Sequence, residues 1–579
     1  MFSAREREAT HQWILRTAQL DAQARAERRS RRSEAIGMAF MLGEQSLSFF
    51  SPDILQHLAG FLEIDDLACL ARTCRKLHNT LVRELLKRPV DLWPQDLESF
   101  LAFLVHLSQN PTTTFPTFWS LSIDFQYVER HRCDTSDGRC VYECRFRLGA
   151  LDGMWELLGE IMQYAHGLSG LALKGCVDRV LSGEELRSVL DLAPGLRSLT
   201  LGEIRQEHLN ALQDVVPDLR TLSFKYHTTL RIPGAAHAPA LLDHFQKLEE
   251  LDVHWFFWQQ QGVQLPNLKK LKVKMVYLGT NMSSWAGALV RTFPNLTHLD
   301  FWEMYSVDPG RDVADRYTNE DGTKFVRMLE QWHAEGEALR REDRRLPLQY
   351  VRVRSLLNLH CLGLSCAQPG ARVYVGTVGV DDTKTIARCL PPLLPKCVGF
   401  CLDTNVKKQL YPICRQLFSS APEMTSLTHV VMNVPTMYLF PWNLPDIAAA
   451  LAHALKESSV SHVLVRVQDT PSTMEECGRP ESGDLYRVLD RHMDRAYASA
   501  PVLLATFRDN VPSARRVFFE LEGFGLTCWE RSGERWVDLG EAEGRRILVA
   551  EKMLGGEMDE VPYPGLPVWD RFEWSPEMK

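Results

Sequence analysis

The sequence predicts a mixed α/β fold: a short module of three helices, then an irregular solenoid with parallel strands on its concave face and helices on its convex face. Three observations lead to this prediction. The chain has 579 residues, several times the length of a typical domain. Apolar residues recur at helical spacing between residues 46 and 94. From residue 168 onward, a leucine-rich pattern of six residues returns every 20 to 29 residues.

The composition is that of a folded globular protein, with 45% hydrophobic and 24% charged residues. It excludes a mainly disordered chain, a collagen-like chain and a small disulfide scaffold. Acidic residues number 74 against 66 lysines and arginines, giving a net charge of −8 and an isoelectric point near 6.2. Because this excess is mild for the length, we expect neither nucleic acid nor a membrane as a partner.

The 14 cysteines are irregularly spaced and include no Cys-x-x-Cys pair. In a chain this long, such spacing indicates reduced and mostly buried thiols. The N-terminus carries acids where a signal peptide has a basic start, and the apolar runs are far shorter than the roughly 20 residues that cross a bilayer. We therefore expect a soluble intracellular protein of the cytoplasm, the nucleus or both.

Residues 46–94 predict the three-helix module, after a charged helical region over 1–45. The first helix begins near Pro52 and Asp53, because proline and an acid suit a first helical turn. Its apolar face consists of Ile54, Leu55, Leu58, Phe61 and Leu62. Two further apolar patterns follow: Leu67, Leu70 and Cys74, then Leu77, Leu81 and Leu85. Three short helices cannot bury all these faces among themselves, so the remaining surface needs the rest of the chain or a partner.

This segment resembles an F-box. The matching residues, in the order and spacing of that motif, are Asp53-Ile54-Leu55, Leu58, Leu62, Asp66-Leu67, Leu70 and Cys74-Arg75. Phe50, Thr73 and a proline shifted by one place depart from it. The resemblance implies docking on a Skp-family adaptor through residues at the matching positions: Pro52, Ile54, Leu55, Leu58, Leu62, Leu67, Leu70 and Cys74. The alternative is an ordinary helical hairpin of a core.

Six segments share the template Leu-x-x-Leu-x-Leu: Leu168–Leu173, Leu196–Leu201, Leu219–Phe224, Leu248–Val253, Leu268–Val273 and Leu296–Phe301. Their starts differ by 28, 23, 29, 20 and 28 residues, which is the period of leucine-rich repeats. A proline two residues before four of them stops the preceding helix. Leu359–Leu364 also fits, in competition with Leu348–Val353. Weaker copies are Cys397–Leu402, with Cys397 at a core position, Leu427–Met432 and Val460–Val465.

These patterns divide the chain into five segments. After the regions 1–45 and 46–94, residues 95–165 are expected to form a linker or helical connection to the repeats. The solenoid covers 166–516 and contains a charged insertion at 303–347, whose Phe325, Met328, Leu329 and Trp332 form a helical apolar face. Residues 517–579 form a C-terminal cap that includes a hairpin around Ser532-Gly533.

The residues between the leucines are predicted to lie on the concave face, because side chains alternate along a strand. Neighbouring strands then bring Glu250 and Asp252 beside Lys270 and Lys272, and these lysines beside Asp300. The opposite charges either satisfy one another or form a surface for recognising a substrate. The candidate substrate-binding residues on this face are Lys225, Glu250, Asp252, His254, Lys270, Lys272, Lys274, His298, Asp300 and Trp302.

No catalytic motif stands out. The sequence contains no Walker-type phosphate loop, no Gly-x-Gly-x-x-Gly and no His-Glu-x-x-His. Two cysteine groups, Cys133, Cys140 and Cys144 near His131, and Cys389, Cys397 and Cys401, lack the spacing of paired zinc knuckles. We therefore expect no catalytic residue, metal or cofactor.

The order of motifs resembles that of F-box proteins with C-terminal leucine-rich repeats. The resemblance implies a substrate-recognition subunit of a Skp–cullin–F-box ubiquitin ligase, in which the F-box docks on the adaptor and the repeats bind the protein to be ubiquitylated. Two other interpretations stay open. One is a repeat scaffold with a degenerate F-box that binds a protein without delivering it for ubiquitylation. The other is an enzyme hidden within residues 303–579, which a deep pocket of convergent titratable groups would indicate.

Overall fold

Two compact units make up the chain: Ala18–Val273 (the N-terminal unit), and Lys274–Lys579 together with Met1–Thr17 (the C-terminal unit). The computed structural model describes residues 55, 90–92, 97–108, 120–125, 154–165, 167–175, 177–212, 218–226, 244–257, 264–278, 285–306, 322–355, 358–359, 362, 367–378, 390, 393–402, 414–415, 418, 424, 426–435, 444–468, 500–521 and 525–553. No helix among these residues has the length and apolar character needed to cross a membrane.

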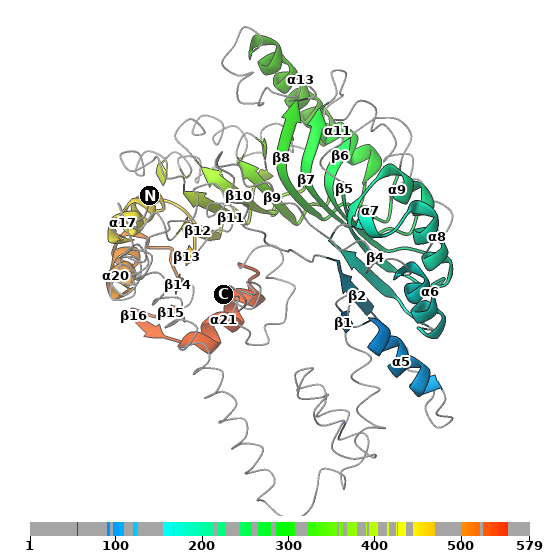
Figure 1. Cartoon of the computed structure of the whole chain (residues 1–579). Coiled ribbons are helices and arrows are strands. Elements are labelled where there is room, and N and C mark those ends of the chain that lie inside the picture. Colours follow the sequence, from blue (N-terminus) through cyan, green and yellow to red (C-terminus); the bar gives the residue numbers. More distant parts are fainter. Residues whose placement is uncertain are drawn as a thin grey trace, which may run out of the picture. The chain divides into compact units, whose positions relative to one another are not determined.

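Strands and helices alternate along the N-terminal unit (Figure 1). Its strands are β1 (Val90–Leu92), β2 (Ser120–Asp124), β3 (Gly170–Lys174), β4 (Ser198–Ile204), β5 (Thr221–Tyr226), β6 (Glu250–Phe257) and the start of β7 (Lys270–Leu278). Its helices are α5 (Leu97–Ser108), α6 (Met154–Tyr164), α7 (Val177–Val180), α8 (Gly183–Asp191) and α9 (Gln206–Leu212). In Figure 1, α6, α8 and α9 lie along one face of these strands.

The C-terminal unit continues the alternation and ends in a hairpin and a helix. Its strands after β7 are β8 (His298–Ser306), β9 (Tyr350–Ser355), β10 (Arg372–Val378), β11 (Cys397–Leu402), β12 (His429–Pro435), β13 (His462–Gln468), β14 (Arg516–Leu521), β15 (Gly525–Ser532) and β16 (Arg535–Asp538). Its helices are α11 (Trp285–Thr292), α13 (Gly322–Arg341), α17 (Leu444–Ala454), α20 (Ala500–Asn510) and α21 (Glu541–Ala550). The predicted hairpin is confirmed, because β15 and β16 pair antiparallel around Ser532-Gly533.

Within each unit, a strand pairs with the strands before and after it in the chain. The pairs from β1 to β6 and from β8 to β14 are parallel, whereas β14–β15 and β15–β16 are antiparallel. Parallel neighbours require a crossover, and a described helix provides it between β1 and β5, between β8 and β9 and between β12 and β14. The predicted mixed α/β class is therefore confirmed, as a solenoid-like fold with a mostly parallel open sheet.

The leucine positions of the template face the helices. Leu199 and Leu201 of β4 are 0% and 1% exposed, whereas the alternating Ser198 and Thr200 are only half-buried. The same alternation places Val430 and Met432 of β12 in the core. Burying these apolar side chains of successive strands produces a continuous apolar layer, since each repeat completes the core of its neighbours.

The start of each strand is fixed by a pair of backbone hydrogen bonds. The N–H groups of Arg197 and Ser198 both donate to the carbonyl oxygen of Ser169, at 2.7 and 2.8 Å. The same arrangement recurs at the starts of β5, β6, β7, β9, β12, β13 and β14. Because the first N–H groups of each of these strands donate to a carbonyl of the preceding repeat, each strand begins in the same register against its neighbour.

Three sequence expectations about the late repeats are corrected by these registers. Leu348–Val353 provides strand β9, whereas Leu359 and Leu362 are helical and buried. In β11, Val398 and Phe400 pair with the core positions of β12, so Cys397 lies on the opposite face and not at the core position predicted for it. Strand β10 was not predicted at all, because Gly370, Val373 and Val375 stand where the template has leucines.

The region expected to connect the module to the repeats contains a strand as well as helices. Strand β2 pairs with β1 and β3, so the ladder already begins at Val90. Within the insertion 303–347, Trp332 of α13 is buried, as its predicted apolar face requires. The side chains of Phe325, Met328 and Leu329 lie outside the described residues.

Replacing Gly202 by alanine is expected to lower the free energy of unfolding by about 3 kcal/mol, at the upper end of overpacking costs. Gly202 occupies a bulge where the register of β4 against β5 shifts, and a Cβ there would lie 2.0 Å from the backbone oxygen of Gly175. Urea unfolding of the purified chain measures the effect. Gly195→Ala is the control, because its Cβ would meet Leu168 O at an ordinary 3.7 Å. Equal costs for the two variants would contradict the argument.

Candidate functional site

Two rows of side chains cross the strands on the face opposite the helices. In the N-terminal unit the first row holds Ser198, Thr221, Glu250 and Lys270, and the second row holds Thr200, Ser223, Asp252 and Lys272. In the C-terminal unit the first row holds His298, Tyr350, Arg372, Cys397, His429, His462 and Arg516. The second row there holds Asp300, Arg352, Tyr374, Gly399, Val431, Leu464 and Phe518. Since neighbouring strands lie about 4.8 Å apart, adjacent members of a row can touch.

The predicted ion pairs between β6 and β7 are present. Glu250 lies 3.0 Å from the ammonium of Lys270, and Asp252 lies 3.5 Å from that of Lys272. Their side chains are between 34% and 45% exposed, so each pair stabilises the fold by only about 0–1 kcal/mol. Asp300 pairs with Arg352 of β9, at 3.7 Å. The side chains of the two pairs between β6 and β7 remain accessible to a partner, whereas that of Asp300 is only 14% exposed.

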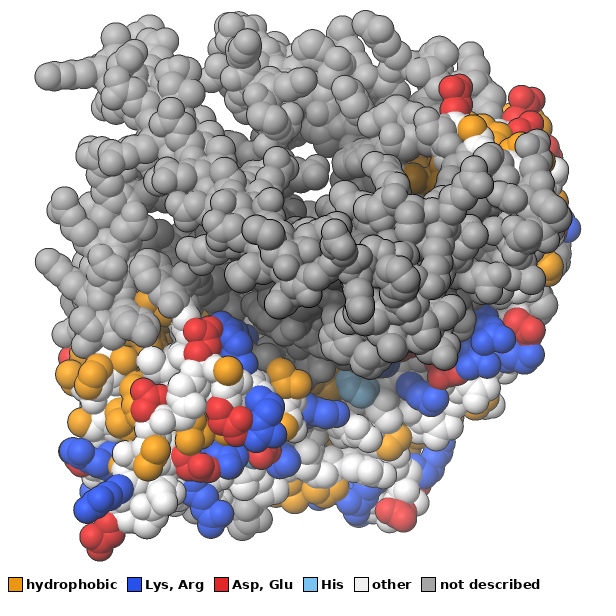
Figure 2. Space-filling model, turned by 90° about the horizontal axis from the view of Figure 1, so that it is seen from below, with side chains coloured by type: hydrophobic (Ala, Val, Ile, Leu, Met, Phe, Trp, Pro, Cys, Tyr) orange, Lys and Arg blue, Asp and Glu red, His pale blue; other side chains and the backbone are white. Residues whose placement is uncertain are grey.

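The other predicted residues of this face have varied positions. Lys225 is exposed at the end of β5, and His298 is half-buried, with its Nδ1 2.9 Å from the hydroxyl of Thr297. His254, Lys274 and Trp302 lie on β6, β7 and β8, but their side chains fall outside the described residues. Where Figure 2 shows described surface, acidic and basic side chains are interspersed. That mixture suits a protein partner better than a polyanion.

Most of the predicted adaptor contacts lie outside the described residues. These are Pro52, Ile54, Leu58, Leu62, Leu67, Leu70 and Cys74. Leu55 is described: it is helical and only 2% exposed. In the isolated chain its side chain therefore packs within the protein itself.

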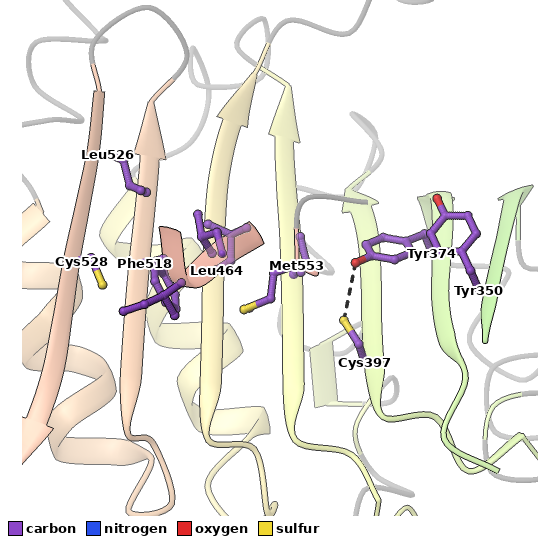
Figure 3. Close-up of a cluster of buried hydrophobic side chains, with 11 residues drawn as sticks. Tyr350, Tyr374, Cys397, Leu464, Phe518, Leu526, Cys528 and Met553 are labelled. Carbon is purple, nitrogen blue, oxygen red and sulfur yellow. Dashed lines mark hydrogen bonds between the residues drawn. The ribbon is translucent and has the colours of Figure 1, made fainter. Parts of the chain in front are cut away.

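In the C-terminal unit, the end of the described chain covers the face opposite the helices (Figure 3). Second-row residues Val431, Leu464 and Phe518 are at most 1% exposed, although they point away from the helices. They share an apolar cluster with Ile547 and Leu548 of α21 and with Met553 of the turn that follows this helix. Gly544 lets α21 approach this closely, because a Cβ there would lie 2.8 Å from Cβ of Cys528. We call the segment Glu541–Met553 the cover segment.

Polar contacts attach the cover segment at both ends. Arg372 and the hydroxyl of Tyr374 both donate to the carbonyl oxygen of Lys552, each at 3.2 Å. At the other end, Arg545 donates to Oε1 of Glu520 at 3.2 Å. Glu520 also accepts a 2.5 Å hydrogen bond from Arg466, a neighbour on β13 whose side chain is 7% exposed. The cover segment therefore completes a buried ionic network on this face.

A cluster of potential metal ligands lies beneath the cover segment. His429 and His462 are adjacent in the first row, and their rings stack with centroids 4.4 Å apart. One ligand atom each of His429, His462 and Glu551 lies within 4.8 Å of the others. Oε2 of Glu551 lies 3.3 Å from Nε2 of His429, whose side chain is 5% exposed. Two nitrogens and a carboxylate are a donor set that transition metals such as zinc prefer.

Both imidazoles are neutral at neutral pH. Burial lowers the pKa of His429, with a smaller contribution from the charge of Lys396 and an opposing one from Glu551. Burial and the neighbouring His429 lower the pKa of His462 to about 4, again against the effect of Glu551. Neutral imidazole is the form that binds metals.

Sequence reasoning missed this cluster. It did place both histidines at the third position of weak repeats, Leu427–Met432 and Val460–Val465, so their adjacency on one face could have been predicted. Glu551 carries no comparable signal, because it belongs to no repeat and reaches the face only through the turn that ends α21.

No protein-family model matches the chain, and no curated protein sequence matches it.

Proposed function

We propose that this chain is a substrate-recognition subunit of a Skp–cullin–F-box ubiquitin ligase. Its F-box-like segment, 46–94, docks on the Skp-family adaptor, and its leucine-rich-repeat region binds the protein to be ubiquitylated. The observation that supports this best is the regular array of polar side chains opposite the helices, which follows the F-box-like motif in the chain. A parallel repeat sheet offers such an array as an extended binding surface.

Within this proposal, the substrate contacts the N-terminal unit. In the C-terminal unit, the second row from Tyr374 to Phe518 is buried beneath the cover segment, whereas the ion pairs between β6 and β7 remain more than a third exposed. Exposed pairs are weak, so a partner's charges can replace them at little cost. The residues assigned to the substrate are therefore the candidates of the N-terminal unit: Lys225, Glu250, Asp252, His254, Lys270 and Lys272. The candidates Lys274, His298, Asp300 and Trp302 belong to the C-terminal unit.

The proposal assigns no chemistry to the chain itself. Burial raises the pKa of the thiols of Cys414 and Cys528 to about 12, so neither is a nucleophile at neutral pH. Among the described residues, Cys397, Cys401, Cys414 and Cys528 form no disulfide, which suits a reducing compartment. We place the protein in the cytoplasm or the nucleus, where such ligases act.

Titration of the purified chain with a Skp-family adaptor tests the proposal. We expect saturable 1:1 binding, and we expect Leu62→Asp combined with Leu67→Asp to weaken it by at least about 100-fold, because two buried apolar contacts each become charged. Leu192→Asp is the control: Leu192 is 40% exposed in the N-terminal unit, so the same substitution there should leave binding unchanged.

The result also separates the two classes of function. If a folded chain does not bind the adaptor, or if the double variant binds as tightly as the unmodified chain, the ligase proposal is wrong. A scaffold that binds a protein through the same rows would then be the better description. Circular dichroism checks that each variant is folded. We expect the repeat region to fold in all of them, because repeats are stabilised mainly by their neighbours.

A further inference from the structure

We propose that His429, His462 and Glu551 bind a divalent transition-metal ion of the zinc class, which ties the cover segment to strands β12 and β13. This site is independent of the proposed ligase function, because its three residues belong to β12, β13 and the cover segment, none of which the ligase proposal assigns to the adaptor or to the substrate. The ion would link the two repeat strands that carry the histidines to the turn after α21 that carries Glu551.

The distances suit a tetrahedral ion. Ligands about 2.0–2.1 Å from zinc are separated by roughly 3.3–3.4 Å from one another. Nε2 of His429 and Oε2 of Glu551 already stand 3.3 Å apart, and the nearest ligand atoms of all three residues fall within 4.8 Å. A small rotation of the His462 ring would complete the three-ligand arrangement. Sites with three protein ligands leave the fourth position for solvent or a partner.

The hydroxyl groups beside the histidines direct Nε2 toward the cluster. Thr428 Oγ1 lies 2.7 Å from Nδ1 of His429, and Ser461 Oγ lies 2.8 Å from Nδ1 of His462. Each hydroxyl also donates its proton to a backbone carbonyl, Thr428 to Lys396 and Ser461 to Thr428. In the tautomer with the proton on Nδ1, each hydroxyl oxygen accepts from Nδ1–H and the lone pair of the ring lies on Nε2. Metal-binding histidines typically donate their other ring N–H to an oxygen acceptor in this way.

In this tautomer the lone pair of His429 Nε2 faces the carboxylate of Glu551, and a cation between them would remove the repulsion. Nε2 of His429 is buried and makes no hydrogen bond, yet it faces a carboxylate oxygen of Glu551 at 3.3 Å. Two electron pairs that face each other in a buried site repel, and a buried polar atom without a hydrogen bond costs about 1–3 kcal/mol. A metal ion between them would turn both atoms into ligands.

Charges around the cluster are nearly balanced. Arg516 donates to Nε2 of His462 at 3.4 Å and would have to give up this long contact, but it keeps its 2.6 Å ion pair with Glu530. Arg372 is hydrogen-bonded to the carbonyl of Lys552, and Lys396 contributes a further positive charge. Because these cations disfavour a hard ion held by charge alone, the site favours a metal that bonds strongly to imidazole: zinc or cobalt, and not magnesium or calcium.

Calorimetric titration of the chelator-treated full chain with Zn²⁺ alone tests the proposal. We expect one ion per chain at neutral pH. His462→Ala and Glu551→Gln should each weaken binding by at least about 100-fold, more than the loss of an outer-shell partner. His298→Ala is the matched control: His298 occupies the same row behind a hydroxyl, Thr297, but lies outside the cluster, so its loss should leave binding unchanged.

Two further measurements keep the test decisive. Co²⁺ should give the visible absorption of a tetrahedral site with nitrogen ligands, and this absorption should disappear in His462→Ala. Thr428→Val removes only the hydroxyl that orients His429, so the variant should fold normally and bind Zn²⁺ about 10- to 100-fold more weakly. If the unmodified chain binds no Zn²⁺, or if the cluster variants bind it as well as His298→Ala does, the metal proposal is wrong. The adaptor titration is unaffected by either result.

Discussion

Replacing Glu520 by alanine is expected to destabilise the C-terminal unit by about 3–5 kcal/mol, the cost of removing one partner of a buried ion pair. The Glu520 carboxylate is 14% exposed and accepts hydrogen bonds from Arg466 at 2.5 Å and from Arg545 at 3.2 Å. Without it, the guanidinium of Arg466 keeps its charge in a site where its side chain is 7% exposed. Losing the carboxylate that compensates this buried charge is the main source of the loss.

Urea unfolding of the purified variant measures the change in the free energy of unfolding. Hydrogen exchange of the amides in β13 and β14 shows whether the loss is located at these strands. Glu541→Ala is the matched control, because Glu541 accepts a 2.8 Å bond from the same Arg545 but is 53% exposed. An exposed i,i+4 pair contributes only about 0.3–0.5 kcal/mol. A cost for Glu520→Ala no greater than that of the control would show that the network is hydrated and has little effect on stability.

Periodicity explains why much of the ladder could be predicted. The spacing of leucines in segments such as Leu196–Leu201 encodes both the strand and the face that it buries, because a one-residue shift would expose every leucine. The pairing of Glu250 with Lys270 follows from the same register and needs no tertiary information. The polar array in the N-terminal unit is therefore a local property of the sequence.

Strands without leucine are harder to predict. In β10, Val373 and Val375 occupy the core positions, and in β11 Val398 and Phe400 do so. Valine and phenylalanine are compatible with either face of a half-buried strand, so the composition alone does not fix the register. Cys397 was assigned to the wrong face for this reason, since a small buried thiol suits either side.

The repeat pattern does not predict that the cover segment packs on the sheet. Val431, Leu464 and Phe518 sit at positions that carry polar side chains in the N-terminal unit, and their apolar character was the available signal that something covers them. Which segment does so depends on a chain reversal after β16, and no sequence period records it. The candidate metal cluster was missed for the same reason, because Glu551 arrives with that segment.

Truncating Leu548 to alanine is expected to lower the stability of the cover segment by about 2–5 kcal/mol, the range for large-to-small substitutions in a core. Leu548 is 0% exposed within the cluster that includes Leu464 and Phe518, so its removal leaves a cavity between α21 and the strands. The amide hydrogens of α21 should exchange faster as the segment opens more often. Opening also exposes an apolar patch, which a fluorescent hydrophobic dye should detect.

The neighbouring residue offers a close control. Val549 lies on the same helix and is 39% exposed, so Val549→Ala should change stability by no more than about 0.5 kcal/mol and leave exchange in α21 unaltered. The contrast between adjacent positions depends only on which side of the helix faces the strands. If both substitutions accelerate exchange equally, the cover segment is held by its polar contacts to Arg372, Tyr374 and Glu520, and the apolar cluster contributes little. If only Leu548→Ala does so, apolar burial holds the cover segment on the sheet, and the position of Glu551 beside His429 and His462 depends on that burial.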